Sequence, residues 1–315
     1  MPIIIHFIIL ITSLFLLAKS AGLVVKNLIK IANILKLSTF IVSFVILGFA
    51  TSTPEVFVGI NSVAENSPQL SLGNVMGATI VLLTFITGIT ALVTGKVVMD
   101  TTFTRKDLVI MNFVILIPVF LLYDSKITKF DSLIMLSAYA IYVIRMYQER
   151  HTLAHPIANH NHKSHITKRI VYLLIGFAGL AATSHYAVNS AIIIAEALRI
   201  PVLLMGILFF SIGTNFPELT IAFTAMRNKQ KTIVLGNVMG SATTNTLIIA
   251  VVSFLQPFEV LDFNTFLVSV FFLVSTVTSF TFFVKSKNEI SRFEGLFLLS
   301  IYCFFVISEI VSKLA

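Results

Sequence analysis

Hydrophobic residues along this chain come in long blocks, separated by short polar stretches rich in lysine and arginine. Each block holds about 17–25 residues, the length at which an α-helix crosses a bilayer. The first block lacks basic residues before Ile3 and a small-residue cleavage site, so we interpret it as a membrane span and not a signal peptide. We predict an all-α integral membrane protein with ten transmembrane helices, at approximately 2–18, 39–64, 70–94, 108–123, 131–147, 170–193, 201–226, 232–255, 264–284 and 293–312.

The composition agrees with a membrane protein and excludes several functions. Of the 315 residues, 57% are hydrophobic and 11% are charged, whereas a soluble domain carries about 25% charged residues. The single cysteine, Cys303, rules out a disulfide framework, and no G-x-x-x-x-G-K-[ST] motif is present to bind a nucleotide. We therefore expect partners limited to inorganic cations and the lipid bilayer, with no nucleic acid, no nucleotide, no cofactor and no enzymatic activity. We expect a monomer or a weak homo-oligomer.

The basic residues alternate from one side of the membrane to the other. Eighteen of the 22 lysines and arginines lie in or beside the stretches that follow segments 1, 3, 5, 7 and 9. Lysine and arginine concentrate on the cytoplasmic side of membrane proteins. The net charge of +8 therefore reports topology, and we predict a multi-pass protein of the cell (inner or plasma) membrane with both termini outside.

Two stretches inside the apolar segments repeat at a fixed offset of 163 residues. G-F-A-T-S-T-P-E at 48–55 precedes G-N-V-M-G at 73–77, and S-I-G-T-N-F-P-E at 211–218 precedes the same pentapeptide at 236–240. An odd number of segments separates the copies, so the second half is inverted relative to the first, with broken helices at the membrane midplane, as in secondary transporters. We predict a first five-helix repeat at 1–148 (motif 48–82), a His-rich cytoplasmic linker at 149–169 and a second repeat at 170–315 (motif 211–245).

The repeated residues offer oxygen atoms at membrane depth. Glu55 and Glu218 are carboxylates that need a cation, a proton or a polar cavity inside a bilayer. Pro54 and Pro217 each disturb the carbonyl four residues earlier, which belongs to Ala50 and Gly213. Hydroxyl groups complete an all-oxygen set that favours Ca²⁺, Na⁺ or H⁺ over zinc or copper; they belong to Thr51, Ser52, Thr214 and Ser241.

With these motifs, the chain resembles the sodium/calcium exchangers of the cation/calcium antiporter superfamily, in a minimal microbial form. The resemblance implies that the two glutamates are shared ligands of Ca²⁺ and Na⁺, and that Thr51, Thr214, Ser52 and Ser241 complete the ion sites. Most exchangers read G-S-N after G-N-V-x, and many place Asn or Asp four residues beyond that serine. The second half keeps these groups in Ser241 and Asn245, with Asn215 in place of the usual serine beside the threonine, whereas the first half has Ala78 and Leu82.

These observations favour a secondary-active antiporter that exports Ca²⁺ in exchange for Na⁺ by alternating access. An H⁺-coupled Ca²⁺ antiporter is the main alternative, because the ligand set is reduced and glutamates also carry protons. A passive cation channel and a degenerate, non-transporting membrane protein are two further alternatives. Five of the seven histidines lie at 151–165, where they form a solvated connector, a loose metal site or a pH sensor. His185, beside Asn189, either lines a proton path or is satisfied within the helix bundle.

Overall fold

The apolar segments of the chain form long helices, since a backbone in lipid must satisfy its hydrogen bonds internally. The computed structural model describes residues 2–34, 46–99, 104–150, 166–227, 231–260 and 263–314. Within these residues, eight helical stretches are long and apolar enough to cross a membrane: Ile3–Ala32, Pro68–Thr94, Arg105–Asp124, Ile166–Leu198, Val202–Arg227, Val234–Leu255, Phe266–Lys287 and Arg292–Ser312. The expected segment at 131–147 is also helical, and part of the one at 39–64 lies outside the described residues.

The first half of the chain contains seven α-helices, one π-helical segment and a 3₁₀ turn in the described ranges. They are α1 (Ile3–Ile34), α2 (Leu47–Thr51), α3 (Thr53–Ala64), α4 (Pro68–Ile80), the π-helix η2 (Val81–Ile86), α5 (Thr87–Thr94), α6 (Arg105–Leu121), the 3₁₀ turn η3 (Leu122–Asp124) and α7 (Lys129–Arg150). The expected end of the first helix near residue 18 is wrong, because α1 continues to Ile34 along α8. Its lysines therefore lie on a helix and not in a loop.

The second half follows a similar order. It contains α8 (Ile166–Leu198), α9 (Val202–Met205), the π-helix η5 (Gly206–Phe210), α10 (Ser211–Thr214), α11 (Phe216–Arg227), α12 (Lys231–Leu255), α13 (Phe263–Lys287) and α14 (Arg292–Leu314). Helix α8 begins at Ile166, inside the range expected for the linker. The histidines of 151–165 lie outside the described residues.

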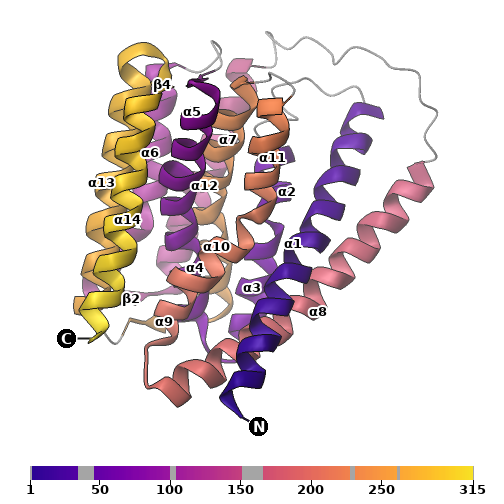
Figure 1. Ribbon diagram of the computed structural model, residues 1–315, viewed down its shortest axis with the longest axis vertical. Helices are drawn as coiled ribbons and strands as arrows, with labels where there is room; N and C mark the ends of the chain where they lie inside the picture. Colours follow the sequence, from indigo (N-terminus) through magenta and orange to yellow (C-terminus); the bar gives the residue numbers. More distant parts are fainter. Residues whose placement is uncertain are drawn as a thin grey trace.

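Two short antiparallel strand pairs join the halves at opposite ends of the helices (Figure 1). Strand β1 (Lys96–Val98) pairs with β4 (Glu289–Ser291), and β2 (Lys126–Ile127) pairs with β3 (Phe258–Glu259). Each pair carries a lysine–glutamate ion pair, Lys96–Glu289 at 2.8 Å and Lys126–Glu259 at 2.7 Å. The Glu259 carboxylate raises the pKa of Lys126. Because three of these four side chains are about half exposed, the ion pairs add little stability.

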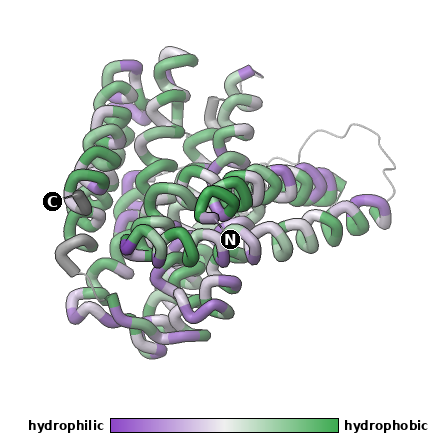
Figure 2. The backbone as a smooth tube through the Cα atoms, turned by 60° about the horizontal axis from the view of Figure 1, so that its bottom comes forward, coloured by the Kyte–Doolittle hydropathy of each residue, from purple (hydrophilic) through white to green (hydrophobic). Residues whose placement is uncertain are grey.

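Helices α1 and α8 lie side by side at one edge of the molecule, where α8 also packs on α3 and α1 packs on α2 and α10, and the two termini lie toward the same end (Figure 1). Small residues allow this close packing: a Cβ atom at Gly176 would lie 2.7 Å from Val24 Cγ2. Apolar residues cover most of the helix surfaces, and hydrophilic residues gather toward helix ends (Figure 2). The two most enclosed spans are Pro68–Thr94 and Val234–Leu255, and these carry the two G-N-V-M-G segments.

Candidate functional site

Two helix breaks define the centre of the candidate site. Helix α2 ends at Thr51, Ser52 has φ −80° and ψ 5°, and α3 begins at Thr53. In the second half, Asn215 has φ −85° and ψ 6° between α10 and α11. Both breaks precede a proline, which lacks an N–H and cannot continue the hydrogen-bond ladder of the preceding helix. The sequence-based prediction of broken helices at the two copies of the motif therefore matches the described chain.

Glu55 and Glu218 lie in the first turns of α3 and α11, with exposed fractions of 2% and 1%. The Glu55 carboxyl lies beside Thr214, the Glu218 carboxyl lies beside Thr51 and Ser241, and the two carboxyls are close enough to repel each other when ionised. Among the described residues, neither oxygen of Glu218 nor Oε2 of Glu55 has a hydrogen-bond partner. Buried carboxylates without partners are costly, so this arrangement suits a bound cation or protons.

Each motif threonine contacts the opposite half of the chain. Thr51 Oγ1 lies 2.9 Å from Ser241 Oγ and 3.5 Å from Asn237 Oδ1, both on α12. Thr214 Oγ1 donates to Asn74 Oδ1 on α4 at 3.1 Å. The two asparagines therefore contact threonine hydroxyls of the opposite half, which a sequence pattern cannot reveal because the partners are far apart along the chain.

Small residues bring the broken helices close to α4 and α12. A Cβ atom at Gly48 would lie 2.9 Å from the carbonyl carbon of Gly240, and one at Gly77 would lie 2.7 Å from Ser211 Cβ. These contacts have no room for a larger residue. Gly236 differs from these glycines, since a Cβ there would meet nothing within 4 Å.

The other expected site residues are buried around the breaks, and their polar groups are partly used within the protein. Ser52 Oγ donates to Gly48 O at 2.9 Å, and Asn215 Nδ2 donates to Ser211 O at 2.6 Å. The buried Asn215 Oδ1 has no partner in the described part of the chain. Asn245 Nδ2 donates to Thr79 Oγ1 at 2.9 Å and to Val75 O at 3.3 Å, so this side chain reaches from α12 to α4.

The carbonyl of Ala50, expected to be freed by Pro54, accepts a hydrogen bond from Thr53 Oγ1 at 2.7 Å. Thr53 is not among the site residues predicted from the sequence, although a hydroxyl directly before the proline and three residues after the carbonyl is a usable signal. In the second half Phe216 occupies the corresponding position and has no hydroxyl. Gly213 is buried at the end of α10.

Ala78 and Leu82, the two residues that depart from the exchanger pattern, are tightly packed. Ala78 and Leu82 have exposed fractions of 0% and 1%. Leu82 falls in the π-helix η2, whereas the corresponding residues 244–249 lie in the regular helix α12. Thr87 Oγ1 donates to Leu82 O at 2.9 Å, five residues earlier. The halves therefore differ in backbone geometry where the first half lacks the polar residue, and π-helical turns often occur at functional sites.

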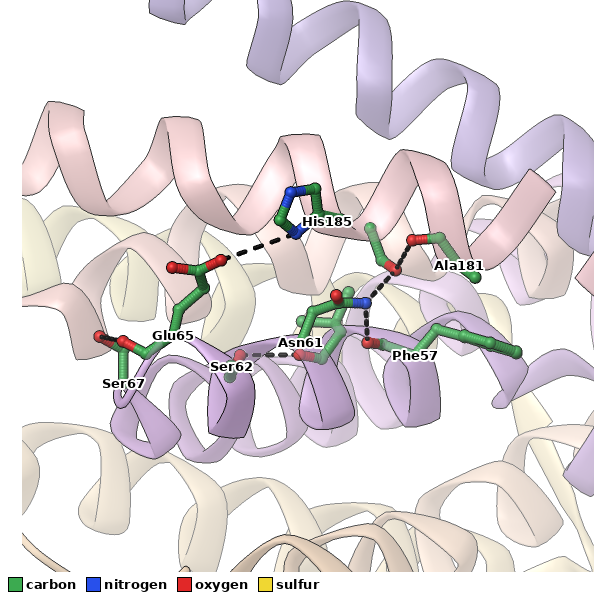
Figure 3. A network of polar contacts seen from close by, with 9 residues as sticks. Phe57, Asn61, Ser62, Glu65, Ser67, Ala181 and His185 are labelled. Carbon is green, nitrogen blue, oxygen red and sulfur yellow. Dashed lines mark hydrogen bonds and ion pairs between the residues drawn. The ribbon is translucent and has the colours of Figure 1, made fainter. Parts of the chain in front are cut away.

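A separate polar network joins the far end of α3 to α8 (Figure 3). Asn61 Nδ2 donates to Ser184 Oγ at 2.7 Å, and His185 Nδ1 lies 3.6 Å from Glu65 Oε1. His185 thus faces Glu65, and half of its side chain is exposed. The sequence pattern indicates His185 beside Asn189 but not its contact with Glu65. This network lies at the opposite end of α3 from Glu55.

Comparison with known proteins places this geometry among ion-exchange proteins of the membrane. The fold matches that of the sodium-calcium exchanger NCX_Mj in a structure soaked with Na⁺ and Sr²⁺, with a TM-score of 0.68 and 24% identity, covering 97% of this chain and 99% of that one. The family described as Sodium/calcium exchanger protein matches residues 5–148 and 168–311. The chain is a multi-pass integral membrane protein and belongs to the sodium/calcium exchanger protein family.

Two curated relatives extend the comparison. The sodium/calcium exchanger MaX1 of Methanosarcina acetivorans is 24% identical over 344 aligned positions, which cover 96% of this chain and 98% of the relative. The inner membrane protein YrbG of Escherichia coli is 23% identical over 249 positions, 76% of each chain. The match to MaX1 extends over almost the whole length of both proteins.

Proposed function

We propose that this protein is a secondary-active antiporter that exports Ca²⁺ in exchange for Na⁺ by alternating access. The observation that carries the proposal is the pair of buried carboxyls, Glu55 and Glu218, which lie at matching helix breaks and lack hydrogen-bond partners for most of their oxygens in the described chain. Membership of the exchanger family and the names of MaX1 and NCX_Mj support cation/calcium exchange. The cations are the transported substrates, and no resident cofactor is proposed.

We further infer ten spans arranged as two inverted five-helix repeats, 1–148 and 170–315, joined by the linker 149–169. The crossed contacts support this arrangement, since Thr51 reaches α12 while Thr214 reaches α4. Both termini lie toward the same end of the molecule, which agrees with an even number of spans (Figure 1). The alternation of basic residues supports both termini lying outside the cell membrane.

The proposed cation ligands come from both repeats. The carboxylates of Glu55 and Glu218 neutralise one Ca²⁺, a hard cation that takes six to eight oxygen ligands at about 2.3–2.6 Å. Hydroxyl, amide and carbonyl oxygens supply the remainder, from Thr51, Ser52, Thr214, Ser241, Asn215, Asn245, Ala50 and Gly213. Two negative charges cannot hold three Na⁺ without excess positive charge. The protein is therefore proposed to bind fewer Na⁺ per cycle than exchangers with the full ligand set.

Exchange of Ca²⁺ for H⁺ is the second candidate, and the proximity of the two carboxyls favours it. Two ionised carboxylates in one buried site repel each other, and a proton on either one removes the repulsion. The proton would then be released when Ca²⁺ binds. Ala78 and Leu82 also remove oxygen atoms that a sodium ion would use, which leaves proton binding at the glutamates unaffected.

The experiment is ⁴⁵Ca²⁺ uptake into proteoliposomes under an imposed Na⁺, K⁺ or H⁺ gradient. We expect uptake driven by Na⁺, and loss of uptake in Glu55→Gln and in Glu218→Gln, because amides keep the shape but not the charge. Glu65→Gln is the matched control, since this carboxyl lies at the other end of α3 and faces His185. Uptake driven only by H⁺ would favour the second candidate. Normal uptake in both glutamine variants would overturn the site, and absence of uptake in the unmodified protein would indicate a non-transporting relative.

A further inference from the structure

The asparagines of the two G-N-V-M-G segments are buried polar residues without a role in the transport scheme so far. Asn74 and Asn237 have exposed fractions of 0% and 2%. Each contacts one motif threonine of the opposite half: Asn74 Oδ1 lies 3.1 Å from Thr214 Oγ1, and Asn237 Oδ1 lies 3.5 Å from Thr51 Oγ1. We propose that the two asparagines are positioning residues that orient these threonine hydroxyls toward the transported cation, an inference that rests on the proposed function.

A hydroxyl group has one proton to donate and two acceptor lone pairs. Thr214 Oγ1 has two acceptors for its proton, Phe210 O at 2.9 Å and Asn74 Oδ1 at 3.1 Å. Thr51 Oγ1 likewise lies 2.9 Å from Leu47 O. The proton of each threonine hydroxyl points toward the carbonyl of its own helix and the asparagine oxygen. The lone pairs of the hydroxyl oxygen therefore point away from both groups. A cation binds to lone pairs.

The amide nitrogen of Asn74 supports the same positioning role. Its Nδ2 is buried and has no hydrogen-bond partner in the described chain, although a buried donor without a partner is costly. A half-turn of the amide would direct Nδ2 to Thr214 Oγ1 and bring Oδ1 to the unpartnered position. Thr214 would then keep its proton on Phe210 O and one lone pair for the cation. The hydroxyl is held in both amide orientations.

The two asparagines do not contribute equally to the positioning of their threonines. Thr51 also contacts Ser241 Oγ at 2.9 Å, so its hydroxyl has a second polar neighbour on α12. The residue that corresponds to Ser241 in the first half is Ala78, whose methyl group cannot hydrogen-bond. Apart from the Glu55 carboxyl, Asn74 is the only polar side chain of the opposite half that contacts Thr214 Oγ1 in the described part of the chain, so removal of Asn74 should have the larger effect.

Double-mutant cycles on ⁴⁵Ca²⁺ transport in proteoliposomes test the assignment. We expect Asn74→Ala to raise the KM for Ca²⁺ about tenfold, the effect of one hydrogen bond, with Vmax per folded protein unchanged. Thr214→Val should raise the KM similarly, and the double variant should be no worse than Thr214→Val alone. The crossed combination of Asn74→Ala with Thr51→Val should multiply the two effects, because these residues belong to different pairs. Asn237→Ala should raise the KM less than Asn74→Ala.

Asn61→Ala is the matched control, since it removes an amide that binds Ser184 on α8, and it should leave the KM unchanged. Thermal unfolding of each variant measures the folded fraction. If Asn74→Ala does not fold, the cycle is run on Asn237→Ala and Thr51→Val. Multiplicative effects within a pair, or a loss of Vmax with unchanged KM, would overturn the inference while the unmodified protein still transports. Absence of Ca²⁺ transport in the unmodified protein would overturn the proposed function itself.

Discussion

At the scale of single residues, the two copies of the motif are equal in charge but unequal in oxygen atoms. Both supply a buried glutamate and a threonine. The second half adds Ser241, whose hydroxyl lies 2.9 Å from Thr51, whereas Ala78 offers only a methyl group in the corresponding place. The proposed cation site is therefore richer in ligands on the side of the second half, and this inequality should appear in the coupling to Na⁺.

We predict that Ser241→Ala weakens the Na⁺ dependence of Ca²⁺ transport more than Ser52→Ala does. Ser241 contacts a threonine of the other half, while the Ser52 hydroxyl donates its proton to Gly48 O on its own helix. Ala78→Ser should make the Na⁺ dependence steeper by restoring a hydroxyl. The measurement is the Hill slope of ⁴⁵Ca²⁺ transport against Na⁺ concentration. Equal losses in the two alanine variants, or a slope near three in the unmodified protein, would contradict the ligand count.

At the scale of helices, the positions of the breaks depend on proline, and the distance between helices depends on glycine. Gly48 of α2 packs directly on Gly240 of α12. This contact brings Thr51, three residues after Gly48, within hydrogen-bond distance of Ser241. Packing and ligand geometry are therefore coupled at this crossing.

We predict that Gly48→Ala destabilises the protein by about 1–3 kcal/mol, the usual cost of overpacking, and also reduces Ca²⁺ transport. The added Cβ would lie 2.9 Å from the Gly240 carbonyl carbon, and backbone atoms cannot move aside as a flexible side chain can. Gly236→Ala is the matched control, because its Cβ would meet nothing within 4 Å. Thermal unfolding in detergent compares the two. A stability of Gly48→Ala at or above that of Gly236→Ala would show that the crossing is not tight.

Much of the helical organisation could be predicted from the sequence, because the bilayer fixes helix length and proline fixes the breaks. Ser52 and Asn215 interrupt their helices next to the expected prolines. The extension of α1 to Ile34 was missed because its lysines resemble a loop, although Ala21 and Val24 continue the apolar face that packs against α8. The contacts Thr51–Asn237 and Thr214–Asn74 also required the structure, because they join residues more than a hundred positions apart. Local patterns do not encode such pairs.

At the scale of the whole molecule, the two halves of the chain contact each other along α1 and α8, at the broken helices and at the two strand pairs. The pair α1–α8 lies at one edge of the molecule (Figure 1), and α8 contacts α3 through the Asn61–Ser184 and Glu65–His185 pairs. The helix that carries Glu55 is thus held at its start by α12 and at its end by α8. Glu55 and Glu218, the proposed charged ligands, therefore lie where the two halves of the chain meet.

The charge of the site leads to a prediction for the complete transport cycle. Glu55 and Glu218 supply two negative charges, which one Ca²⁺ or two monovalent cations neutralise. We therefore predict electroneutral exchange. A third Na⁺ would carry a net charge across the membrane, worth about 2.3 kcal/mol per 100 mV. A K⁺ gradient with valinomycin sets the potential, and the steady-state ⁴⁵Ca²⁺ accumulation at a fixed Na⁺ or H⁺ gradient is measured. Accumulation should be the same at 0 mV and at about 100 mV of either sign. A change of about fiftyfold, the factor for one net charge, would instead show that a further cation is carried without a balancing carboxylate.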